Sequence, residues 1–202
     1  FFTMWSMANP AITEHIFKSP VPVISEFDLS DKVELEQYNS QNLSFQKASN
    51  LTGSYMGTYG LSSMLFALIL TIYTSKKRIN RKMIHLWSLI LGGIGFISFY
   101  FISDHTYLIL SFALIGISWG SILSMPYAML SSSVKEESMG TSMGIFNMFI
   151  VIPQIIAAIG GINILSSLIG EEPIFSMIIA GLALIIAGFL NLTINDQKTI
   201  SN

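Results

Sequence analysis

Two side-chain amides inside a long uncharged stretch are the best candidates for binding chemistry in this sequence. The stretch is 139–163, MGTSMGIFNMFIVIPQIIAAIGGIN, and the amides belong to Asn147 and Gln154. They are seven residues apart, about two helical turns, so they share one face of a helix. An amide both donates and accepts hydrogen bonds, as a hydroxyl does, and adds no charge. The pair favours a neutral, polyhydroxylated ligand, and the alternative is a hydrogen bond to a neighbouring helix.

Two prolines are expected to distort the helices that carry these groups. Pro153 has no backbone N–H and frees a carbonyl one turn back, which weakens the helix beside Gln154. Pro126 should act in the same way within an earlier apolar stretch. A weakened helix with an exposed carbonyl is suited to gripping a polar solute inside a membrane bundle.

Four aromatic side chains are further candidates for a ligand path. A flat ring can stack on the apolar face of a pyranose while its polar tip forms a hydrogen bond. Each ring alone is equally consistent with an interface anchor or with packing between helices. The four are Tyr55 and Tyr59, which lie one turn apart and share a face, Trp119 and Tyr127.

The composition is that of a membrane protein and excludes several other classes. Apolar residues make up 51% of the chain and charged residues only 11%, whereas a soluble domain usually has about 25% charged residues. There is no cysteine, no His/Asp/Glu set has metal spacing, and no Ser–His–Asp set can be placed. We therefore predict a protein that is not an enzyme and that needs no cofactor or metal.

The apolar pattern predicts an all-α membrane protein with one broken span and five complete ones. Residues 1–17 form the end of a truncated span, and 18–50 form a polar outer loop, with a short surface helix at 30–38 capped by Ser30. Residues 51–202 then hold five transmembrane helices and a short tail. The complete spans are expected at 51–74, 83–103, 107–131, 139–164 and 173–194.

The basic residues predict the orientation of the bundle. The link 75–82, SKKRINRK, holds five Lys or Arg residues, which places it in the cytoplasm under the positive-inside rule. Counting crossings puts 132–138 and the C-terminus in the cytoplasm too, and puts 18–50, 104–106 and 169–172 outside. A basic cluster can also bind anionic lipid or nucleic acid. The topological interpretation is favoured because the cluster lies tightly between two spans, and no nucleic-acid partner is expected.

Small and ionisable residues inside the spans are interpreted structurally. His85, near the cytoplasmic end of its span, favours a structural or interfacial role over a proton relay, and Glu14 and His15 are expected at a solvated helix end. Three GxxxG pairs favour packing within the bundle over dimerisation, and a Gly92-Gly93-Ile94-Gly95 run inside a span is not a phosphate loop. The pairs are Gly53/Gly57, Gly116/Gly120 and Gly140/Gly144.

Two long strings resemble a known transporter family. SILSMPYAMLSSSV (121–134) and MGTSMGIFNMFIVIPQIIAAIGG (139–161) resemble the tenth and eleventh helices of sucrose/proton symporters. They resemble more closely the related bacterial maltose (α-glucoside) permeases of the major facilitator superfamily. Residues 4–17 resemble the end of helix seven, and 75–82 lies where that superfamily has a basic link between helices eight and nine. This link lacks the full Gly/Asp-rich motif of the superfamily.

The resemblance implies a fold and a function. The chain would be the C-terminal six-helix half of a twelve-helix transporter of the cell (inner) membrane, a fragment surrounded by lipid and partnered by a missing N-terminal half. It would take part in alternating-access symport of a disaccharide such as maltose or sucrose with a coupling proton. The alternatives are a major facilitator that carries another solute and a non-transporting membrane protein, such as a sensor or an assembly subunit.

The predicted orientation can be tested with single cysteines, because the chain has none of its own. A cysteine replacing Ser75, in the basic link, should resist an impermeant thiol reagent in intact cells. A cysteine replacing Ser40, in the outer segment, should react. Labelling of the Ser75 variant together with protection of the Ser40 variant would reverse the orientation.

Overall fold

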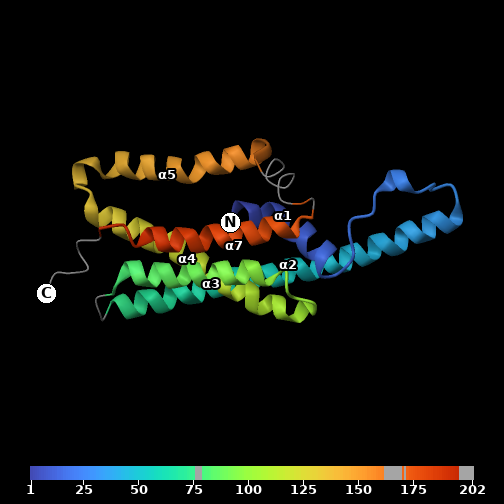
Figure 1. Cartoon of the computed structure of the whole chain (residues 1–202), viewed down its shortest axis with the longest axis horizontal. Coiled ribbons are helices and arrows are strands. Elements are labelled where there is room, and N and C mark those ends of the chain that lie inside the picture. Colours follow the sequence, from blue (N-terminus) through green and yellow to red (C-terminus); the bar gives the residue numbers. More distant parts are fainter. Residues whose placement is uncertain (76–78, 162–169, 171, 196–202) are drawn as a thin grey trace.

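The computed structural model describes residues 1–75, 79–161, 170 and 172–195, and six α-helices run through them (Figure 1). Four segments are long and apolar enough to cross a membrane: Lys32–Thr74, His105–Ser133, Glu136–Gly160 and Ile174–Asn191. Three basic residues of the 75–82 link lie outside the described residues, as do the end of the span expected at 139–164 and part of the 169–172 turn. The ranges outside the description are 76–78, 162–169, 171 and 196–202. The helices are α1 (Phe2–His15), α2 (Lys32–Thr74), α3 (Arg81–Ser98), α4 (Leu108–Ser133), α5 (Met139–Ile156) and α7 (Ile174–Asn191).

Helix α2 corrects the prediction of a loop through residue 50. Its 43 residues form one continuous helix, so the polar segment before the span is mostly helical and projects beyond the bundle (Figure 1). The cap is Asp31, not Ser30: its carboxylate accepts hydrogen bonds from the backbone N–H groups of Val33, at 2.7 Å, and Glu34, at 3.4 Å. A carboxylate at this position satisfies N–H groups that have no partner within the helix. Its negative charge also interacts favourably with the positive end of the helix dipole.

The core of the bundle is formed by α3 and α4, with the other packed helices around them. Helix α4 packs against α2 and α3, α7 packs against α3, and α1 packs against α7 and α2. The buried cluster joins Met4 and Ile12 of α1 to Phe96, Phe112 and Met177 of α3, α4 and α7. Segments distant in the sequence therefore share one apolar core. Short links between antiparallel helices make this arrangement possible.

Glycine sets the closest approach between α2 and α4. A Cβ atom added to Gly116 would lie 2.2 Å from the backbone oxygen of Tyr59 and 2.1 Å from Oγ of Ser62. A Cβ atom added to Gly120 would lie 3.0 Å from the Ser63 backbone oxygen. The other two GxxxG pairs, by contrast, have open space around every added Cβ. The packing prediction therefore holds for Gly116/Gly120 and is wrong for Gly53/Gly57 and Gly140/Gly144.

The glycine-rich run of α3 also packs against neighbouring helices. An added Cβ on Gly92 would meet Ser118 of α4 at 2.3 Å, and one on Gly93 would meet the Gly181 backbone oxygen of α7 at 2.7 Å. Gly95 would meet the Ser111 backbone oxygen of α4, also at 2.7 Å. Small residues on opposite sides of α3 thus let α4 and α7 approach it at the same time.

Helix α5 stands apart from the packed helices. Figure 1 shows it running alongside the bundle, antiparallel to α4, and none of its residues is buried. Beyond Ile156 the helix widens into a π-helical turn, Ala157–Gly161. Gly160 has φ 133°, a backbone conformation that residues with a side chain rarely adopt. Direct contacts between α5 and the bundle are therefore few and come from single side chains.

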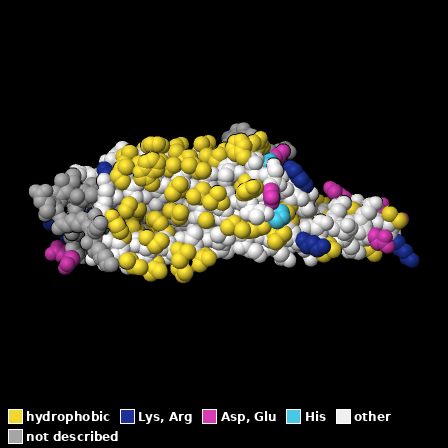
Figure 2. All heavy atoms as spheres, turned by 90° about the horizontal axis from the view of Figure 1, so that it is seen from below, with side chains coloured by type: hydrophobic (Ala, Val, Ile, Leu, Met, Phe, Trp, Pro, Cys, Tyr) yellow, Lys and Arg dark blue, Asp and Glu magenta, His cyan; other side chains and the backbone are white. Residues whose placement is uncertain are grey.

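The charged residues lie at the ends of an apolar belt. Figure 2 shows hydrophobic side chains covering the middle of the molecule, with Lys, Arg, Asp and Glu gathered towards its two extremities. At the predicted cytoplasmic end, Arg81 donates from Nη1 to the Ala128 carbonyl at 2.8 Å, near the end of α4. Lys82 donates to the carbonyls of Leu192, at 2.9 Å, and Ile194, at 2.6 Å, just beyond α7. Lys82 thus satisfies carbonyls just beyond the C-terminus of α7, where positive charge is favoured, and Arg81 adds a hydrogen bond to a carbonyl in the last two turns of α4.

The C-terminal end of α1, which was expected to be solvated, is partly exposed: Glu14 and His15 are both half-buried, and His15 also packs against neighbouring segments. The His15 ring stacks on Tyr100 with 5.3 Å between centroids, and its Nε2 lies 3.1 Å from the Tyr100 carbonyl oxygen. Nδ1 of the same ring lies 3.8 Å from a carboxylate oxygen of Glu172, just before α7. His15 therefore ties α1 to the outer ends of α3 and α7.

The approach of α2 to α4 predicts a sharp difference between two glycine substitutions. Gly116→Ala should lower the melting temperature of the purified protein in detergent, because its new methyl group would collide with the Tyr59 backbone oxygen. Gly57→Ala, in open space on α2, should be neutral or slightly stabilising, since alanine favours helix by about 1 kcal/mol over glycine. Equal melting temperatures for the two variants would contradict this packing.

Candidate functional site

An aromatic group joins α1, α2 and α4. The Trp5 ring lies edge-on to Trp119, with 5.3 Å between centroids, and its Nε1 donates to the Tyr59 hydroxyl at 3.3 Å. The Phe1 ring also packs against Trp119, with 4.6 Å between the ring centroids. The structure thus brings together Tyr59 and Trp119, two of the predicted residues. Trp5 remains 46% exposed, so one indole of the group is accessible to a ligand.

A second contact joins α4 to the otherwise separate α5. The Tyr127 hydroxyl donates to Oδ1 of Asn147 at 2.8 Å, and the Tyr127 ring packs edge-on against Phe146, with 5.0 Å between centroids. Two predicted residues therefore form a pair with each other. The contact uses the acceptor half of the Asn147 amide and leaves its NH₂ group available to donate.

Gln154 differs from Asn147 in having no hydrogen-bonding partner within the described part of the chain. Its side chain is half-buried, on a helix whose other residues at 147–153 are exposed. It follows Pro153, and the π-helical turn begins three residues later, at Ala157. The helix thus loses its regular form just beyond Gln154. Pro126, in contrast, lies within α4, which continues as an α-helix to Ser133.

The amides and rings fall at two depths along the bundle. Helices α4 and α5 meet at a short turn, so depth can be counted from it at about 1.5 Å per residue. Trp119 and Gln154 then lie roughly 21 Å and 22 Å from the turn, at about the same level. Tyr127 and Asn147 lie roughly 9 Å and 12 Å from the turn, so they are nearer to it than Trp119 and Gln154 are. An amide is thus level with an aromatic side chain at each depth.

Tyr55 lies apart from both levels. Its hydroxyl is 2.8 Å from Nδ1 of His105, in the outer turn before α4, and the His105 ring stacks on Phe17 with 5.0 Å between centroids. This contact joins α2 to the outer turns of the bundle. Tyr55 and Tyr59 share a helix face but have different partners: Tyr55 contacts His105, and Tyr59 belongs to the aromatic group.

Three residues of the site, Phe1, Trp5 and Phe146, were not predicted from the sequence. Trp5 lies in the segment interpreted as a broken span, and Phe146 is one of several phenylalanines in an apolar run. The only sequence signal for Trp5 was its type, a residue that combines a large flat surface with an N–H donor. Nothing in the pattern separates Phe146 from Phe149, which is 75% exposed.

The ionisable groups provide no evidence for catalytic or metal chemistry. His85 is buried, and its Nδ1 lies 2.8 Å from Oγ of Ser121, which joins α3 to α4 as a structural role requires. Within the described residues, no group of three or more His, Asp or Glu side chains is placed to hold a metal ion. The arrangement at α1, α4 and α5 is one of amides and aromatic rings.

A comparison with models of protein families gives a match that spans nearly all of the chain. A sequence model described as Major Facilitator Superfamily matches residues 1–200. No solved structure matches the chain. All six helices described above fall within the matched range.

The contact between Tyr127 and Asn147 predicts a specific cross-link. Cysteines replacing these two residues should be joined efficiently by a short bifunctional thiol reagent in membranes, because the native side chains touch. The matched control pairs cysteines at Tyr127 and Gln154, which differ in depth by roughly 13 Å, and should give little product. Mobility on a denaturing gel reports the result. A stronger product from the control pair would mean that α5 has a different register.

Proposed function

This chain belongs to the major facilitator superfamily, a family of membrane transporters, and we propose that the solute it carries is a sugar. The family and the four membrane-length helices make it a multi-pass membrane protein that takes part in moving a solute across the bilayer. The proposal adds the class of that solute, the residues that bind it and the mode of transport.

The observation that carries the proposal is the half-buried, unpaired amide of Gln154 at the level of an aromatic group. In a membrane, a polar side chain without a partner is costly, so such a group is expected to face water, protein or a ligand. Its NH₂ and C=O groups match a hydroxyl that both donates and accepts. Trp119 and the exposed ring of Trp5 offer flat surfaces for the apolar face of a sugar ring.

The absence of membrane acids supports a neutral solute. Helices α3, α4, α5 and α7 contain no Asp or Glu. A cationic solute is usually met by a carboxylate within the membrane, and an anionic one by Arg, Lys or a helix N-terminus. An amide and indole site suits an uncharged, polyhydroxylated molecule, and the resemblance of 121–134 and 139–161 to maltose and sucrose carriers narrows it to a disaccharide.

We propose that the helices form one six-helix half of a twelve-helix carrier that works by alternating access. The sugar would bind near the midplane between the halves, as in other transporters with this organisation. The poor contact between α5 and its own bundle, with every residue at 147–153 exposed, supports a surface that another half would cover. A coupling proton would then be bound by groups outside α3, α4, α5 and α7.

The orientation completes the proposal. With the basic link in the cytoplasm, the turn between α4 and α5 and the C-terminus also face the cytoplasm of the cell (inner) membrane. The turn carries Lys135, which is exposed. The Asn147–Tyr127 pair would then lie on the cytoplasmic side of Gln154 and contact the sugar through the free NH₂ group of the amide.

Replacement of Gln154 tests the proposed site. In the full-length protein, Gln154→Leu should weaken maltose or sucrose binding by about tenfold, since a lost hydrogen bond costs on the order of 1–1.5 kcal/mol. Ile155→Ala, which changes an exposed apolar neighbour, should leave sugar affinity unchanged. Binding is measured by titration, and the melting temperature in detergent is measured in parallel. Unchanged affinity with a lower melting temperature would make Gln154 a packing residue.

A further inference from the structure

A small cavity at the end of the bundle opposite the basic link collects several ionisable side chains. It has a volume of about 160 Å³ and lies between the C-terminal end of α1 and the start of α7. The ionisable side chains that line it are Glu14, His15, Lys18 and Glu172. Figure 2 shows histidine and acidic side chains close together where the apolar belt ends. None of the four belongs to the proposed sugar site, so an inference from them does not depend on the transported solute.

The two ring nitrogens of His15 both face acceptors. Nε2 lies 3.1 Å from the Tyr100 carbonyl oxygen, and because a carbonyl only accepts, Nε2 carries a hydrogen. Nδ1 lies 3.8 Å from a carboxylate oxygen of Glu172. In the neutral ring, Nδ1 would therefore present a lone pair to a negatively charged oxygen, which is unfavourable. In the protonated ring, both nitrogens carry hydrogens and each has an acceptor.

The charges around the His15 ring favour the same protonation state. Glu14 and Glu172 carry negative charges that repel each other, and Lys18 supplies one positive charge, so a proton on His15 balances the group. The ring also stacks on the Tyr100 ring with 20° between the planes, and an aromatic face attracts a cation. The titratable groups that meet the ring thus come from α1, from the segment after α3 and from the segment before α7.

We propose that His15 is a proton-binding site and that its protonated form locks the ends of α1, α3 and α7 together. The imidazolium donates from Nε2 to the Tyr100 carbonyl and pairs through Nδ1 with the Glu172 carboxylate, so one side chain joins three segments. When the proton leaves, the attraction to Glu172 is lost and the start of α7 is held less firmly to α1. Because an imidazole titrates between about pH 5 and 8, the lock closes as the pH at this end of the bundle falls.

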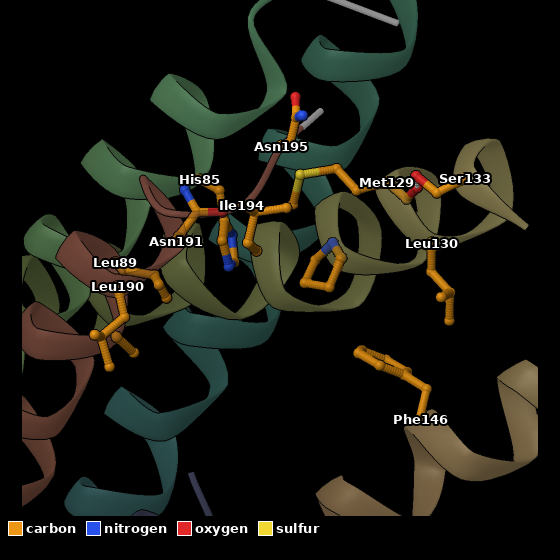
Figure 3. A pocket seen from close by; sticks show the side chains of 12 residues that line it. His85, Leu89, Met129, Leu130, Ser133, Phe146, Leu190, Asn191, Ile194 and Asn195 are labelled. Carbon is orange, nitrogen blue, oxygen red and sulfur yellow. Dashed lines mark hydrogen bonds between the residues drawn. The ribbon is translucent and has the colours of Figure 1, made fainter. Parts of the chain in front are cut away.

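The other two histidines of the chain lack this arrangement. Nδ1 of His105 lies 2.8 Å from the Tyr55 hydroxyl, which can donate to a neutral ring. His85 is paired with the Ser121 hydroxyl and borders a cavity at the opposite end of the bundle, whose described lining holds no charged side chain (Figure 3). Neither ring needs a second proton to satisfy its partner. His105 is the matched control, since it lies at the same end of the bundle as His15.

Carbene footprinting tests the lock with the full-length protein in nanodiscs, where both ends of the bundle meet the same buffer. The probe is a neutral, water-soluble diazirine that is activated by light. Ala11 and Ile174 line the cavity and are fully buried, so their labelling reports its opening. Labelling, read by mass spectrometry, should be roughly threefold lower at pH 5.5 than at pH 7.5, the effect of a partly exposed ion pair.

Three substitutions separate His15 from its neighbours. In His15→Gln, labelling should no longer depend on pH, because an amide gains no proton in this range. Glu172→Gln removes the partner of Nδ1 and should shrink the difference, whereas His105→Gln should keep it in full. Each variant is checked for an unchanged melting temperature at pH 7.5, where the lock is open.

The wild-type comparison is decisive by itself, because equal labelling of the wild-type protein at the two pH values would overturn the proposal. A pH dependence that persists in His15→Gln would mean that another group, such as Glu14, takes up the proton, and it would overturn the assignment to His15. Loss of the pH dependence in His105→Gln as well as in His15→Gln would also overturn it, because the effect would then not be specific to the ring that faces Glu172.

Discussion

The need to satisfy polar groups where water is absent governs most of this structure. A bilayer offers no partner to an amide, a hydroxyl or a carbonyl, so each must find one within the protein or in a ligand. His85 shares a hydrogen bond with Ser121, and Tyr127 donates one to Asn147. The carbonyls just beyond α7 accept hydrogen bonds from Lys82. Against this background, the amide of Gln154 is informative, because no hydrogen-bonding partner for it lies within the described part of the chain. It lies level with an aromatic group, and the proposed sugar site follows from this position.

The helical, membrane-spanning character of the chain could be predicted from its sequence, because hydropathy and length depend on local composition. Helix α5 begins at Met139, as predicted, since the preceding Lys135, Glu136 and Glu137 mark the end of the apolar pattern. The extent of α2 could not be predicted in this way. Its outer part, KVELEQYNSQNLSFQK, is polar all round but rich in helix formers, and Asp31 caps it. Hydropathy detects only the apolar half of such a helix.

Partners across the bundle were the least predictable part. The sequence identifies Asn147 as a polar group on an apolar helix, but the choice between a ligand and Tyr127 depends on how α4 and α5 cross. Similarly, three GxxxG pairs look alike in the sequence, yet only Gly116/Gly120 faces a neighbouring helix. Trp5 illustrates the same limit, since its role arises only where α1 brings it to Trp119. Local patterns predict which residues are unusual, and tertiary packing decides what each of them contacts.

Because α2 is one continuous helix, small movements inside the bundle would be amplified at its N-terminal end. Its 43 residues correspond to a rod of roughly 64 Å, of which about 27 Å, from Lys32 to Asn50, precedes the apolar part. Because a hydrogen-bonded helix resists bending, a tilt of α2 at the level of Gly116 would be magnified at its outer tip. A rotation of about 10° around Ser62 would move Lys32 by roughly 8 Å, given 1.5 Å per residue. Small rearrangements beside the aromatic group would thus produce larger displacements at the N-terminal end of α2.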